Sequence, residues 1–417
     1  MLELSNRRLR RKLNPSAYGG AFDMERVVQD ARPQWRERCE SVGFSFYDMP
    51  SEGGRPYWNE TAAYKFNDVE IGVLEGATQE LIYRTFDAAE HVVRKRRFRE
   101  FGIPEKFWGM VTDSWDQDDP TVYGRFDLAY NGTDAPKMLE YNADTPTSLL
   151  ESSVVQWQWM TDVKGDGFDQ FNSIHEQLVD QWRRIRVGRW MLDQGATLHF
   201  ASLHDAGDGE LLVEDFENIA YMAETAKQAG FEPKLLHMED IGWNGKQFTD
   251  LEEQPIEQIF KLYPWEWMVN EEFGDKILES RDTTRWVEPI WKMLLSNKQL
   301  LVVMHELFPT HPNILPAYNG LNRLFGSQFV RKPKLSREGA NVEVRDARGN
   351  LLEAQDGDYG DEGYIFQAYA NLAHFAGKNA VIGSWVVGET PAGIDMRETS
   401  TLITGNMAEF VPHYIEK

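Results

Sequence analysis

Residues 123–144 read YGRFDLAYNGTDAPKMLEYNAD, the most informative pattern in the chain. Two runs of alternating residues flank NGTDAP, whose Asn, Gly and Pro are typical of a hairpin loop. Because successive side chains of a strand point to opposite faces, Arg125 and Asp127 share one face of the first strand. Glu140 and Asn142 share one face of the second strand. The pattern therefore predicts an antiparallel hairpin with a charged face.

The register of this hairpin decides which charges meet. A pairing of Tyr130 with Lys137 places Asp127 opposite Glu140. Directly opposed side chains have Cβ atoms about 4.5 to 5.5 Å apart, so the two carboxylates would repel each other unless a cation lay between them. The register thus makes a metal site plausible.

Magnesium is the cation that suits these ligands. It takes hard oxygen ligands from one or two carboxylates and completes its shell with water and substrate phosphate. Asp127, Glu140 and the amide oxygen of Asn142 fit that preference. Arg125, opposite Asn142, suits a phosphoryl oxygen or a developing oxyanion. The alternative, an exposed charged face with a cross-strand ion pair, stays open at this point.

The composition describes a large acidic protein. Lys and Arg number 44 against 67 Asp and Glu, and the 417 residues carry a net charge of −23. Phosphate backbones and anionic lipids repel such a charge, which disfavours nucleic acid and membranes as partners. The length favours two or three packed regions with a cleft, as in a small-molecule enzyme. Cys39 has no second cysteine to pair with, and no apolar signal core follows the basic run 7–12, so we expect a cytoplasmic protein.

The rest of the chain shows two kinds of periodicity. Apolar residues at helical spacing predict helices over 75–101 and 173–191. Strands are predicted at 196–202 and 256–263, on either side of a helix near 215–230, which makes this portion alternating α/β. Beyond Val330, the pattern changes to short β-rich runs separated by glycine-rich turns, which predict an antiparallel sheet: FVRKP, NVEVRD, YIFQAYA and NAVIGSWVVGE.

The hairpin sequence resembles a known family. GRFDLAY, followed by LEYNADTPTSLLES, is similar to the metal-binding signature of the glutathionylspermidine synthase family, and further similar segments follow in the same order to the end of the chain. The resemblance implies an α/β (α+β) protein with the ATP-grasp fold and an associated pre-ATP-grasp-like α/β domain. It implies an ATP- and Mg²⁺-dependent carboxylate–amine ligase, as a stand-alone synthetase without the amidase domain of some members.

The resemblance also implies a division of the chain. The synthetase-like region would span residues 1–417, with the metal-binding hairpin at about 110–160. A substrate-side α/β region would occupy about 195–290, and the nucleotide-binding region about 291–417.

The resemblance assigns site residues in four sets. The metal ligands are Asp127, Glu140 and Asn142. The residues that stabilise the reacting acyl group are Arg125, Thr147 and Arg397. The nucleotide contacts, drawn partly from SNKQLL, VRKPKLSREGANVEV, YIFQAYA and GIDMRETSTLI, are Arg125, Asp127, Lys298, Lys332, Glu338, Gly339, Ala340, Gln367, Leu402 and Ile403. The substrate contacts are Thr145, Glu214 and Asp215, with Glu409 as a weaker candidate.

Several of these residues also have an ordinary structural interpretation. Thr145 and Thr147 could cap a helix that begins near residue 148. A lone lysine is normally a surface residue. Arg397 could form a surface ion pair with Glu398 or a neighbouring acid. Glu214 and Asp215 could belong to a charged helix face.

The substrates are less defined than the nucleotide. Residues 261–267 read KLYPWEW, where bifunctional relatives carry a threonine-containing strand, so Leu262 and Trp267 stand where hydroxyl groups are expected. Loss of hydrogen-bonding groups can change substrate preference by orders of magnitude, so glutathione and spermidine are not carried over. We expect a peptide-like carboxylate and an amine, with polyamines among the candidates.

Two other functions compete with a ligase. The first is a non-catalytic nucleotide- or polyamine-binding protein that kept the fold. The second is a metal-dependent hydrolase in which Asp127 and Glu140 hold a metal that activates water. The sequence contains no G-x-G-x-x-G, P-loop, G-x-S-x-G or H-E-x-x-H motif, so dinucleotide, P-loop, nucleophile-elbow and zincin functions lack support.

Overall fold

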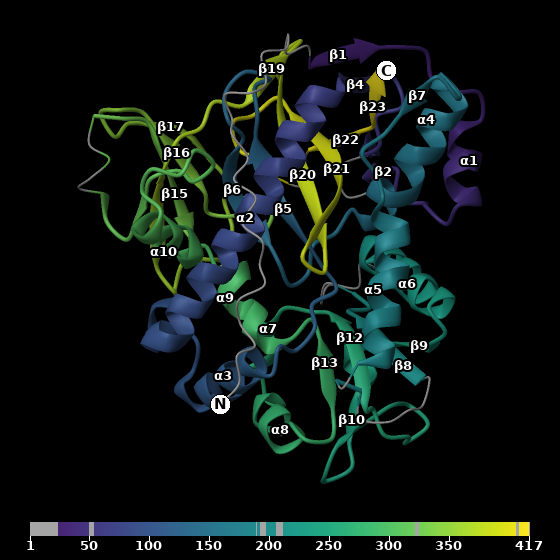
Figure 1. Cartoon of the computed structure of the whole chain (residues 1–417), viewed down its shortest axis with the longest axis vertical. Coiled ribbons are helices and arrows are strands. Elements are labelled where there is room, and N and C mark those ends of the chain that lie inside the picture. Colours follow the sequence, from purple (N-terminus) through teal and green to yellow (C-terminus); the bar gives the residue numbers. More distant parts are fainter. Residues whose placement is uncertain are drawn as a thin grey trace, which may run out of the picture.

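The computed structural model describes residues 24–49, 54–188, 190–191, 197–205, 212–321, 324, 326–405 and 408–416. The basic run 7–12 lies outside them. Four main sheets organise the described chain, and Figure 1 shows the two largest in its upper half and the parallel one below them.

The central sheet is antiparallel and carries the hairpin. Its strand order is β22-β21-β20-β5-β6, with β19 paired to β20. The strands are β5 (Tyr123–Ala129), β6 (Lys137–Asn142), β19 (Ala373–Phe375), β20 (Lys378–Val387), β21 (Thr390–Thr399) and β22 (Glu409–Val411). The long helix α2 (Asp68–Lys95) crosses one face of this sheet (Figure 1).

Helix α2 is longer at its start and shorter at its end than the predicted helix over 75–101. Asn67 caps it by accepting hydrogen bonds from the backbone N–H groups of Val69 and Glu70, so the helix begins at Asp68. Arg96 has a left-handed φ of 54°, which ends the helix, and a short 3-10 segment η3 (Arg97–Phe101) follows. The cap residues Asn67 and Arg96 determine where the helix begins and ends, and the spacing of apolar residues carries no information on either position.

A second antiparallel sheet lies beside β6. Its order is β14-β18-β15-β16-β17. The strands are β14 (Ala317–Tyr318), β15 (Phe329–Pro333), β16 (Glu343–Arg345), β17 (Leu351–Ala354) and β18 (Tyr364–Ala368), next to helices α9 (Met293–Ser296) and α10 (Gln299–Leu307). The predicted antiparallel sheet beyond Val330 is confirmed for FVRKP, NVEVRD and YIFQAYA, whereas NAVIGSWVVGE forms β20 and pairs with β5 in the central sheet.

A parallel sheet forms the lower part of the molecule in Figure 1, with order β13-β12-β8-β9. Its strands are β8 (Thr197–Ser202), β9 (Glu232–His237), β12 (Gln258–Leu262) and β13 (Arg285–Val287). The neighbouring helices are α5 (Ile174–Val187), α6 (Val213–Gln228), α7 (Trp265–Met268) and α8 (Gly274–Glu279). The alternating α/β prediction is confirmed for this portion.

The remaining elements surround these sheets. A fourth sheet joins β1 (Glu25–Val28), β4 (Ala62–Phe66), β23 (His413–Glu416) and β7 (Phe168–Asp169). The others are α1 (Trp35–Ser41), β2 (Asp48–Met49), β3 (Arg55–Pro56), η4 (Glu105–Phe107), α3 (Trp108–Asp116), η5 (Glu151–Val155), α4 (Gln156–Lys164), η6 (Met238–Asp240), β10 (Gly242–Trp243), β11 (Phe248–Thr249) and η7 (Ile290–Lys292).

Buried aromatic side chains join the central and parallel sheets. The Tyr123 ring at the start of β5 lies 5.8 Å from the Phe260 ring of β12 and stacks on Trp385 of β20 at 6.2 Å. Trp182 of α5 and Phe200 of β8 extend the same cluster. Large buried rings dominate core energetics, so the hairpin is anchored at its base to the parallel sheet.

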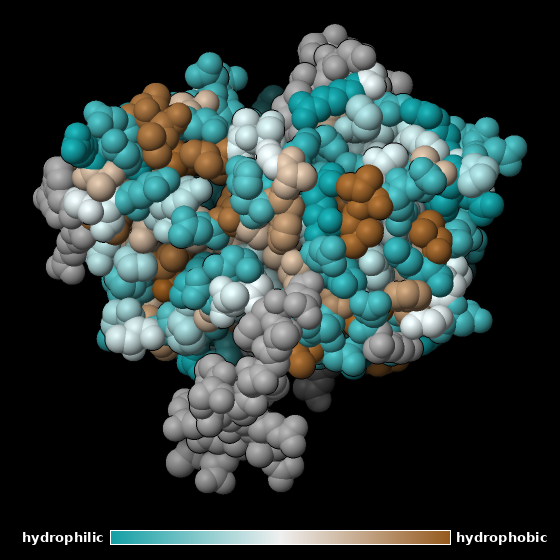
Figure 2. Space-filling view, turned by 90° about the horizontal axis from the view of Figure 1, so that it is seen from above, coloured by the Kyte–Doolittle hydropathy of each residue, from teal (hydrophilic) through white to brown (hydrophobic). Residues whose placement is uncertain are grey.

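The surface seen in Figure 2 is mainly hydrophilic. In this view from above, the hydrophobic areas are small and separate. No helix among the described residues is long and apolar enough to span a membrane.

Candidate functional site

The charged face of the hairpin has the predicted register. Asp127 of β5 lies opposite Glu140 of β6, and Arg125 lies opposite Asn142. Strand alternation and cross-strand pairing therefore bring all four side chains to one face.

The predicted pairing at the loop end of the hairpin is wrong by one residue. Lys137 pairs with Ala129 and not with Tyr130, because the register shifts between Asp127 and Leu128. Such a bulge adds one residue to a strand and re-aims the side chains beside it. Sequence alternation had no signal for that extra residue.

Two arginines neutralise Asp127. The nearest atom pairs are Arg125 Nε to Asp127 Oδ1 at 3.1 Å and Arg397 Nη2 to the same oxygen at 2.7 Å. Burial alone would raise the pKa of Asp127, but the guanidinium charges of Arg397 and Arg125 outweigh it and hold that pKa below its usual range. Asp127 is therefore ionised. Arg397 meets this acid and not Glu398, which pairs instead with Arg26.

Glu140 faces Lys298, which directly precedes α10, and Lys332 of β15 in the second antiparallel sheet. Lys298 Nζ lies 3.2 Å from Glu140 Oε2. The amide nitrogen of Asn142 donates to the other carboxylate oxygen at 3.4 Å. Burial and the charge of Asp127 raise the pKa of Glu140, whereas Lys298 and Lys332 lower it and prevail. Two ionised carboxylates thus stand side by side, each held by cations.

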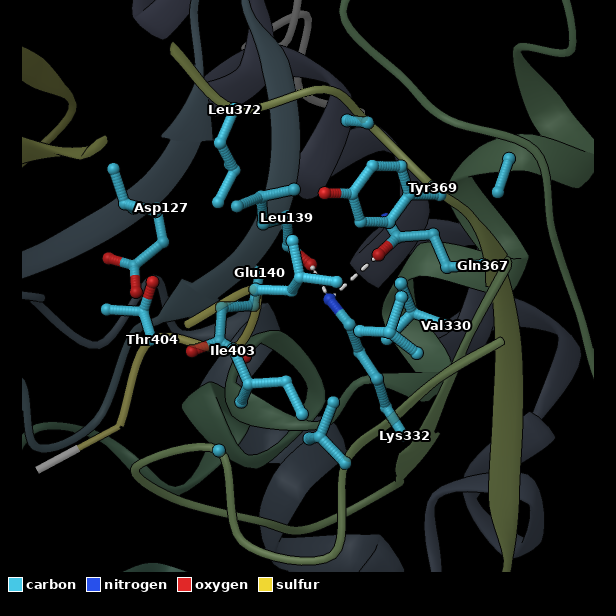
Figure 3. A pocket seen from close by; sticks show the side chains of 17 residues that line it. Asp127, Leu139, Glu140, Val330, Lys332, Gln367, Tyr369, Leu372, Ile403 and Thr404 are labelled. Carbon is cyan, nitrogen blue, oxygen red and sulfur yellow. Dashed lines mark hydrogen bonds between the residues drawn. The ribbon is translucent and has the colours of Figure 1, made fainter. Parts of the chain in front are cut away.

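Lys332 of β15 is buried at the bottom of the same site. Its ammonium donates to the backbone oxygen of Leu139 at 3.0 Å and to Gln367 Oε1 at 2.8 Å, the two dashed contacts of Figure 3. Burial lowers the pKa of Lys332 to about 8, against the opposing effect of Glu140. An anion that binds beside Lys332 would therefore favour the protonated form of its ammonium group.

A pocket opens between the central sheet and the second antiparallel sheet. Figure 3 shows Asp127 and Glu140 on one side, Lys332 and Gln367 on another, and Tyr369 at the rim. Apolar side chains fill the walls between them, and Leu402, Ile403 and Thr404 close one edge. An apolar slot with charged groups at one end suits a flat ring carrying an anionic tail. Of the other predicted residues, Gly339 also lines this pocket, together with Ala368.

Residues 336–342, which we call the glycine loop, lie against that edge. Gly339 has a φ of +73°, and a Cβ atom there would be 2.7 Å from Ile403 Cγ2. Glu338 also has a left-handed φ, of 54°, and its backbone oxygen accepts a hydrogen bond from Gln355 Nε2 at 2.8 Å. The loop is also tied to Lys298, whose Nζ donates to the Ser336 oxygen at 2.7 Å. The predicted segment containing Glu338, Gly339 and Ala340 therefore lies beside the pocket.

Arg337 is a site residue that the sequence interpretation missed. Its Nη1 donates to Thr145 Oγ1 at 2.5 Å, its Nη2 lies 3.0 Å from Glu266 Oε1, and its guanidinium lies 5.6 Å from the centre of the Trp267 ring. It stands inside the glycine loop sequence already singled out. Only the fold brings it to Thr145 and α7.

An acidic area lies beyond Thr147, on the first turn of α6. Burial raises the pKa of Glu214 to about 8, helped by the charges of Glu151 and Asp215, whereas a hydrogen bond with Thr147 opposes the rise. Burial likewise raises the pKa of Asp215 to about 6 and that of Glu151 to about 7. The backbone oxygen of Thr147 accepts a hydrogen bond from Arg125 Nη1 at 2.7 Å. Thr147 thus connects the acidic area to the hairpin.

Three residues that were considered in connection with the substrates do not line the pocket: Leu262, Trp267 and Glu409. Leu262 is buried in the core. Trp267 packs at 5.3 Å on Tyr263 and faces Arg337. Glu409, on β22, pairs with Lys378 at 2.8 Å.

The hairpin ligands fit a magnesium ion. The described residues contain no group of three or more His, Cys, Asp and Glu that could hold a metal. Magnesium needs fewer protein ligands, because one or two carboxylates suffice when water and substrate phosphates supply the rest. Asp127 and Glu140 are opposed and ionised, and the Asn142 side chain lies beside them. This donor set suits Mg²⁺ better than a metal that prefers nitrogen or sulfur.

The fold places the chain in a structural class. It is similar to the apo structure of a glutathione synthetase-like effector from Globodera pallida, with a TM-score of 0.51 and 7% identity, over 85% of this chain and 89% of that chain. Such a likeness reports the fold alone. It agrees with the predicted α/β protein of ATP-grasp type.

The family follows from the sequence comparisons. The family model described as glutathionylspermidine synthase preATP-grasp matches residues 26–416. A Haemophilus influenzae protein assigned as an acid–amine ligase is 41% identical over 402 residues, which cover 94% of this chain and 99% of that protein. The chain belongs to the glutathionylspermidine synthase family and is an enzyme of the carbon–nitrogen ligase class, which confirms the resemblance seen in the hairpin.

Two longer relatives align over part of their length. Trypanothione synthetase of Crithidia fasciculata is 29% identical, over 74% of this chain and 49% of that protein. The bifunctional glutathionylspermidine synthetase/amidase of Escherichia coli is 23% identical, over 83% of this chain and 59% of that protein. The chain thus spans about half the length of these two relatives.

Proposed function

We propose that this protein joins a carboxylate to an amine with the consumption of ATP, using Mg²⁺ and an acyl-phosphate intermediate. The observation that carries the proposal is the pairing of Asp127 with Glu140, flanked by Arg125 and Arg397 on one side and by two lysines on the other. A pair of ionised acids among fixed cations suits a metal-bound polyphosphate.

The nucleotide would bind in the pocket of Figure 3, within the proposed nucleotide-binding region 291–417. The adenine would lie between the apolar walls beside Gln367, with the backbone of residues 368–369 and of Leu402 and Ile403 at its edge. Lys298 and Lys332 would contact phosphates, because both ammonium groups lie at the charged end of the pocket. The backbone at Glu338, Gly339 and Ala340 would cover the phosphates.

Asp127, Glu140 and Asn142 would hold the metal. When bound, Mg²⁺ supplies charge that polarises the γ-phosphate and offsets negative charge in the transition state. Arg125 and Arg397 already hold Asp127 in its ionised form, which keeps this ligand ready at neutral pH.

The reaction has two steps. A carboxylate oxygen of the acid forms a bond to the γ-phosphorus, and the bond from that phosphorus to the bridging oxygen breaks, so ADP leaves. The amine nitrogen then forms a bond to the acyl carbon, phosphate departs with the electrons of the carbon–oxygen bond, and the nitrogen loses a proton. Arg125, Arg397 and Thr147 would stabilise the oxyanion, because Arg125 and Arg397 converge on Asp127 and Arg125 contacts Thr147.

The amine would approach from the acidic area of the substrate-side region, about 195–290. Asp215, whose pKa of about 6 leaves it ionised at neutral pH, would attract a cationic amine, and the bound ammonium would favour loss of the protons from Glu214 and Glu151 beside it, so a polyamine fits. The acid would lie near Thr145 and Thr147, between that area and the hairpin. The names of the two longer relatives, trypanothione synthetase and glutathionylspermidine synthetase/amidase, are consistent with a peptide-like acid and such an amine.

The test is a condensation assay. The protein is incubated with Mg²⁺, ATP and pooled peptides, amino acids and polyamines, and ADP and condensed products are sought by mass spectrometry. ADP together with an amide product is expected. Nucleotide binding without ADP would favour a binding protein, and hydrolysis that needs no ATP would favour the metal-dependent hydrolase.

Variants of the hairpin sharpen this assay. Asp127→Asn and Glu140→Gln keep the side-chain shape but remove one negative charge each, so each is expected to lower turnover by at least about a hundredfold. Asp134→Asn removes an acid from the exposed loop of the same hairpin, away from the residues that line the pocket, and is the matched control. Full activity in either hairpin variant would reject the assignment.

A further inference from the structure

Five residues form a closed ring of contacts between the hairpin, α7 and the glycine loop. Asp144 Oδ2 accepts a hydrogen bond from the backbone N–H of Trp265 at 2.9 Å. Glu266 Oε1 lies 3.0 Å from Arg337 Nη2, and Arg337 Nη1 donates to Thr145 Oγ1 at 2.5 Å. Thr145 follows Asp144 in the chain, which closes the circuit. We call these five residues the docking ring.

Asp144 is the buried anchor of the docking ring. It is 1% exposed, and its Oδ1 lies 2.7 Å from Nζ of Lys261, whose side chain is 0% exposed. The same ammonium donates to the backbone oxygen of Tyr263 at 2.8 Å. The Trp265 N–H that Asp144 accepts is at the first position of α7, where Pro264 provides no side-chain cap. Asp144 therefore fixes both β12 and α7 relative to the end of the hairpin.

A second buried pair holds the preceding residue. Lys292 donates to the backbone oxygens of Ala143 and Tyr123, both at 2.7 Å, and pairs with Glu288 at 3.2 Å. The backbone that leads from the hairpin to Thr145 is thus held at two consecutive residues, Ala143 and Asp144. Few degrees of freedom remain for the position of the Thr145 hydroxyl.

The buried ion pair of Asp144 and Lys261 is better explained by its role in positioning α7 than by a contribution to the free energy of unfolding. Removing water from two charges costs several kcal/mol, and apolar residues of similar volume often replace such pairs without loss of stability. What apolar residues cannot supply is an acceptor for the Trp265 N–H. The geometry of α7 depends on that acceptor.

Helix α7 presents Glu266 and Trp267 to Arg337, which directly precedes Glu338 and Gly339 of the glycine loop. We propose that Asp144 is a positioning residue, which acts through Lys261 and α7 to hold the Arg337 end of the glycine loop closed over the reaction centre. The expected effect of Asp144 on turnover rests on the proposed ligase function, whereas its expected effect on the position of the glycine loop does not.

The rate of trypsin cleavage after Arg337 reports whether the glycine loop is closed, because trypsin reaches that peptide bond only once the loop opens. Asp144→Leu/Lys261→Met removes both charges of this buried pair together, and with them the acceptor for the Trp265 N–H. We expect the thermal midpoint to stay near that of the parent and cleavage of the 337–338 bond to become about tenfold faster, since loss of one hydrogen bond to a charged group favours local opening by about that factor. Cleavage sites outside the glycine loop should keep their rates.

The matched control removes another buried ion pair. Arg32 Nε lies 2.6 Å from Glu60 Oε1, and neither residue belongs to the docking ring. Arg32→Met/Glu60→Leu should leave the cleavage rate at 337–338 within about twofold of the parent, because local opening of the loop does not involve that pair. A folded Asp144→Leu/Lys261→Met protein with unchanged cleavage after Arg337 would overturn the proposal.

A second variant decides the question if the first does not fold. Glu266→Gln breaks the Arg337 ion pair at a partly exposed position and leaves the buried pair intact. It should also speed cleavage after Arg337, and an unchanged rate would mean that the docking ring does not hold the loop.

Turnover provides a separate readout of the positioning role. Because water reaches an acyl phosphate under an open loop, variants of the ring should release more ADP per amide bond than the parent. Accelerated cleavage in a protein that forms no amide with any substrate pair would keep the loop inference and reject the ligase proposal. An unchanged ratio of ADP to amide would overturn the catalytic part of the inference.

Discussion

At the scale of single residues, the site combines charges that burial would otherwise disfavour. Asp127 and Glu140 both have lowered pKa values although burial raises them, since each meets cations from another strand or helix. Lys332 shows the opposite balance: burial prevails over Glu140 and lowers the pKa of its ammonium to about 8. The carboxylates are therefore fixed in one charge state, whereas Lys332 titrates near physiological pH.

Nucleotide affinity should depend on pH through Lys332. Its ammonium is fully charged well below pH 8 and loses its proton as pH rises through about 8, whereas a bound phosphate would raise that pKa. Affinity for Mg-ATP should therefore be constant from pH 6 to 7 and fall about tenfold for each pH unit above 8. Calorimetry across this range measures the effect.

Lys332→Arg is the matched variant, because arginine keeps its charge throughout that range. Its affinity for Mg-ATP should be independent of pH. A parent protein whose affinity does not change between pH 7 and 9.5 would contradict the assignment of Lys332 to a phosphate.

The same titration has a consequence for stability, with a defined sign. The unfolded chain binds the Lys332 proton up to the ordinary lysine pKa of about 10.4, whereas the folded protein releases it near 8. The unfolded state binds more protons between these values, so this group makes the free energy of unfolding rise with pH in that window. Urea unfolding at pH 7.5 and 9.5 should show a smaller rise in Lys332→Met than in the parent.

At the scale of elements, two glycines let chain segments approach closely. Gly383 of β20 lies between Asp127 of β5 and Asp395 of β21, and a Cβ atom there would be 2.3 Å from Asp395 Oδ2. Asp395 is fully buried and accepts a hydrogen bond from Trp385 Nε1 at 2.7 Å. Gly339 has the same role in the glycine loop, against Ile403.

Gly339→Ala should impair nucleotide binding. The left-handed φ of +73° disfavours alanine, and its methyl group would meet Ile403, so the glycine loop should move from the pocket edge. We expect affinity for Mg-ATP to fall about tenfold, from roughly 1 to 2 kcal/mol of strain and lost contact. Gly349→Ala is the control: its φ is +84°, but no atom lies within 4 Å of the added Cβ. Equal losses in both variants would mean that backbone strain alone is responsible.

Gly383→Ala tests the central sheet. The added methyl group would displace the buried Asp395 carboxylate from Trp385, so we expect the free energy of unfolding to fall by about 2 to 4 kcal/mol. Gly109→Ala, in α3, meets no atom within 4 Å and should be neutral or slightly stabilising. Denaturant unfolding compares the two variants, and similar stabilities would contradict this account of Gly383.

The elements also show how far sequence patterns reach. Alternation gave the face and the register of Arg125 and Asp127, because cross-strand geometry is local. It missed the bulge after Asp127, where β6 carries one extra residue, Leu139, because alternation does not mark where a strand gains a residue. It missed Arg337, since the contact with Thr145 joins positions 192 residues apart. For Leu262 the strand was correctly predicted, and only packing shows that its side chain enters the core.

At the scale of the whole molecule, the site lies where separate units meet. The hairpin supplies the acids, the second antiparallel sheet supplies Lys332, and the parallel sheet supplies Lys261 and α7. No single unit contains the full set. The described units share buried clusters at their boundaries, so the geometry of the site depends on how they pack.

Loss of the aromatic contact between the central and parallel sheets should therefore affect stability and site together. Phe260 is 1% exposed and contacts Tyr123, at the base of the hairpin, as well as Trp182. Phe260→Ala should lower the free energy of unfolding by about 3 to 5 kcal/mol. Phe273→Ala, at a position that is 49% exposed, is the control and should change it little.

A further prediction concerns the cooperativity of unfolding in the parent protein. Because Tyr123 belongs both to the hairpin strand and to the cluster around Phe260, the parallel sheet cannot unfold without exposing the base of the hairpin. Circular dichroism and Mg-ATP binding should therefore be lost at the same urea concentration, and Phe260→Ala should move both transitions equally. Nucleotide binding that survives the first half of the unfolding transition would show that the hairpin site stands without the parallel sheet.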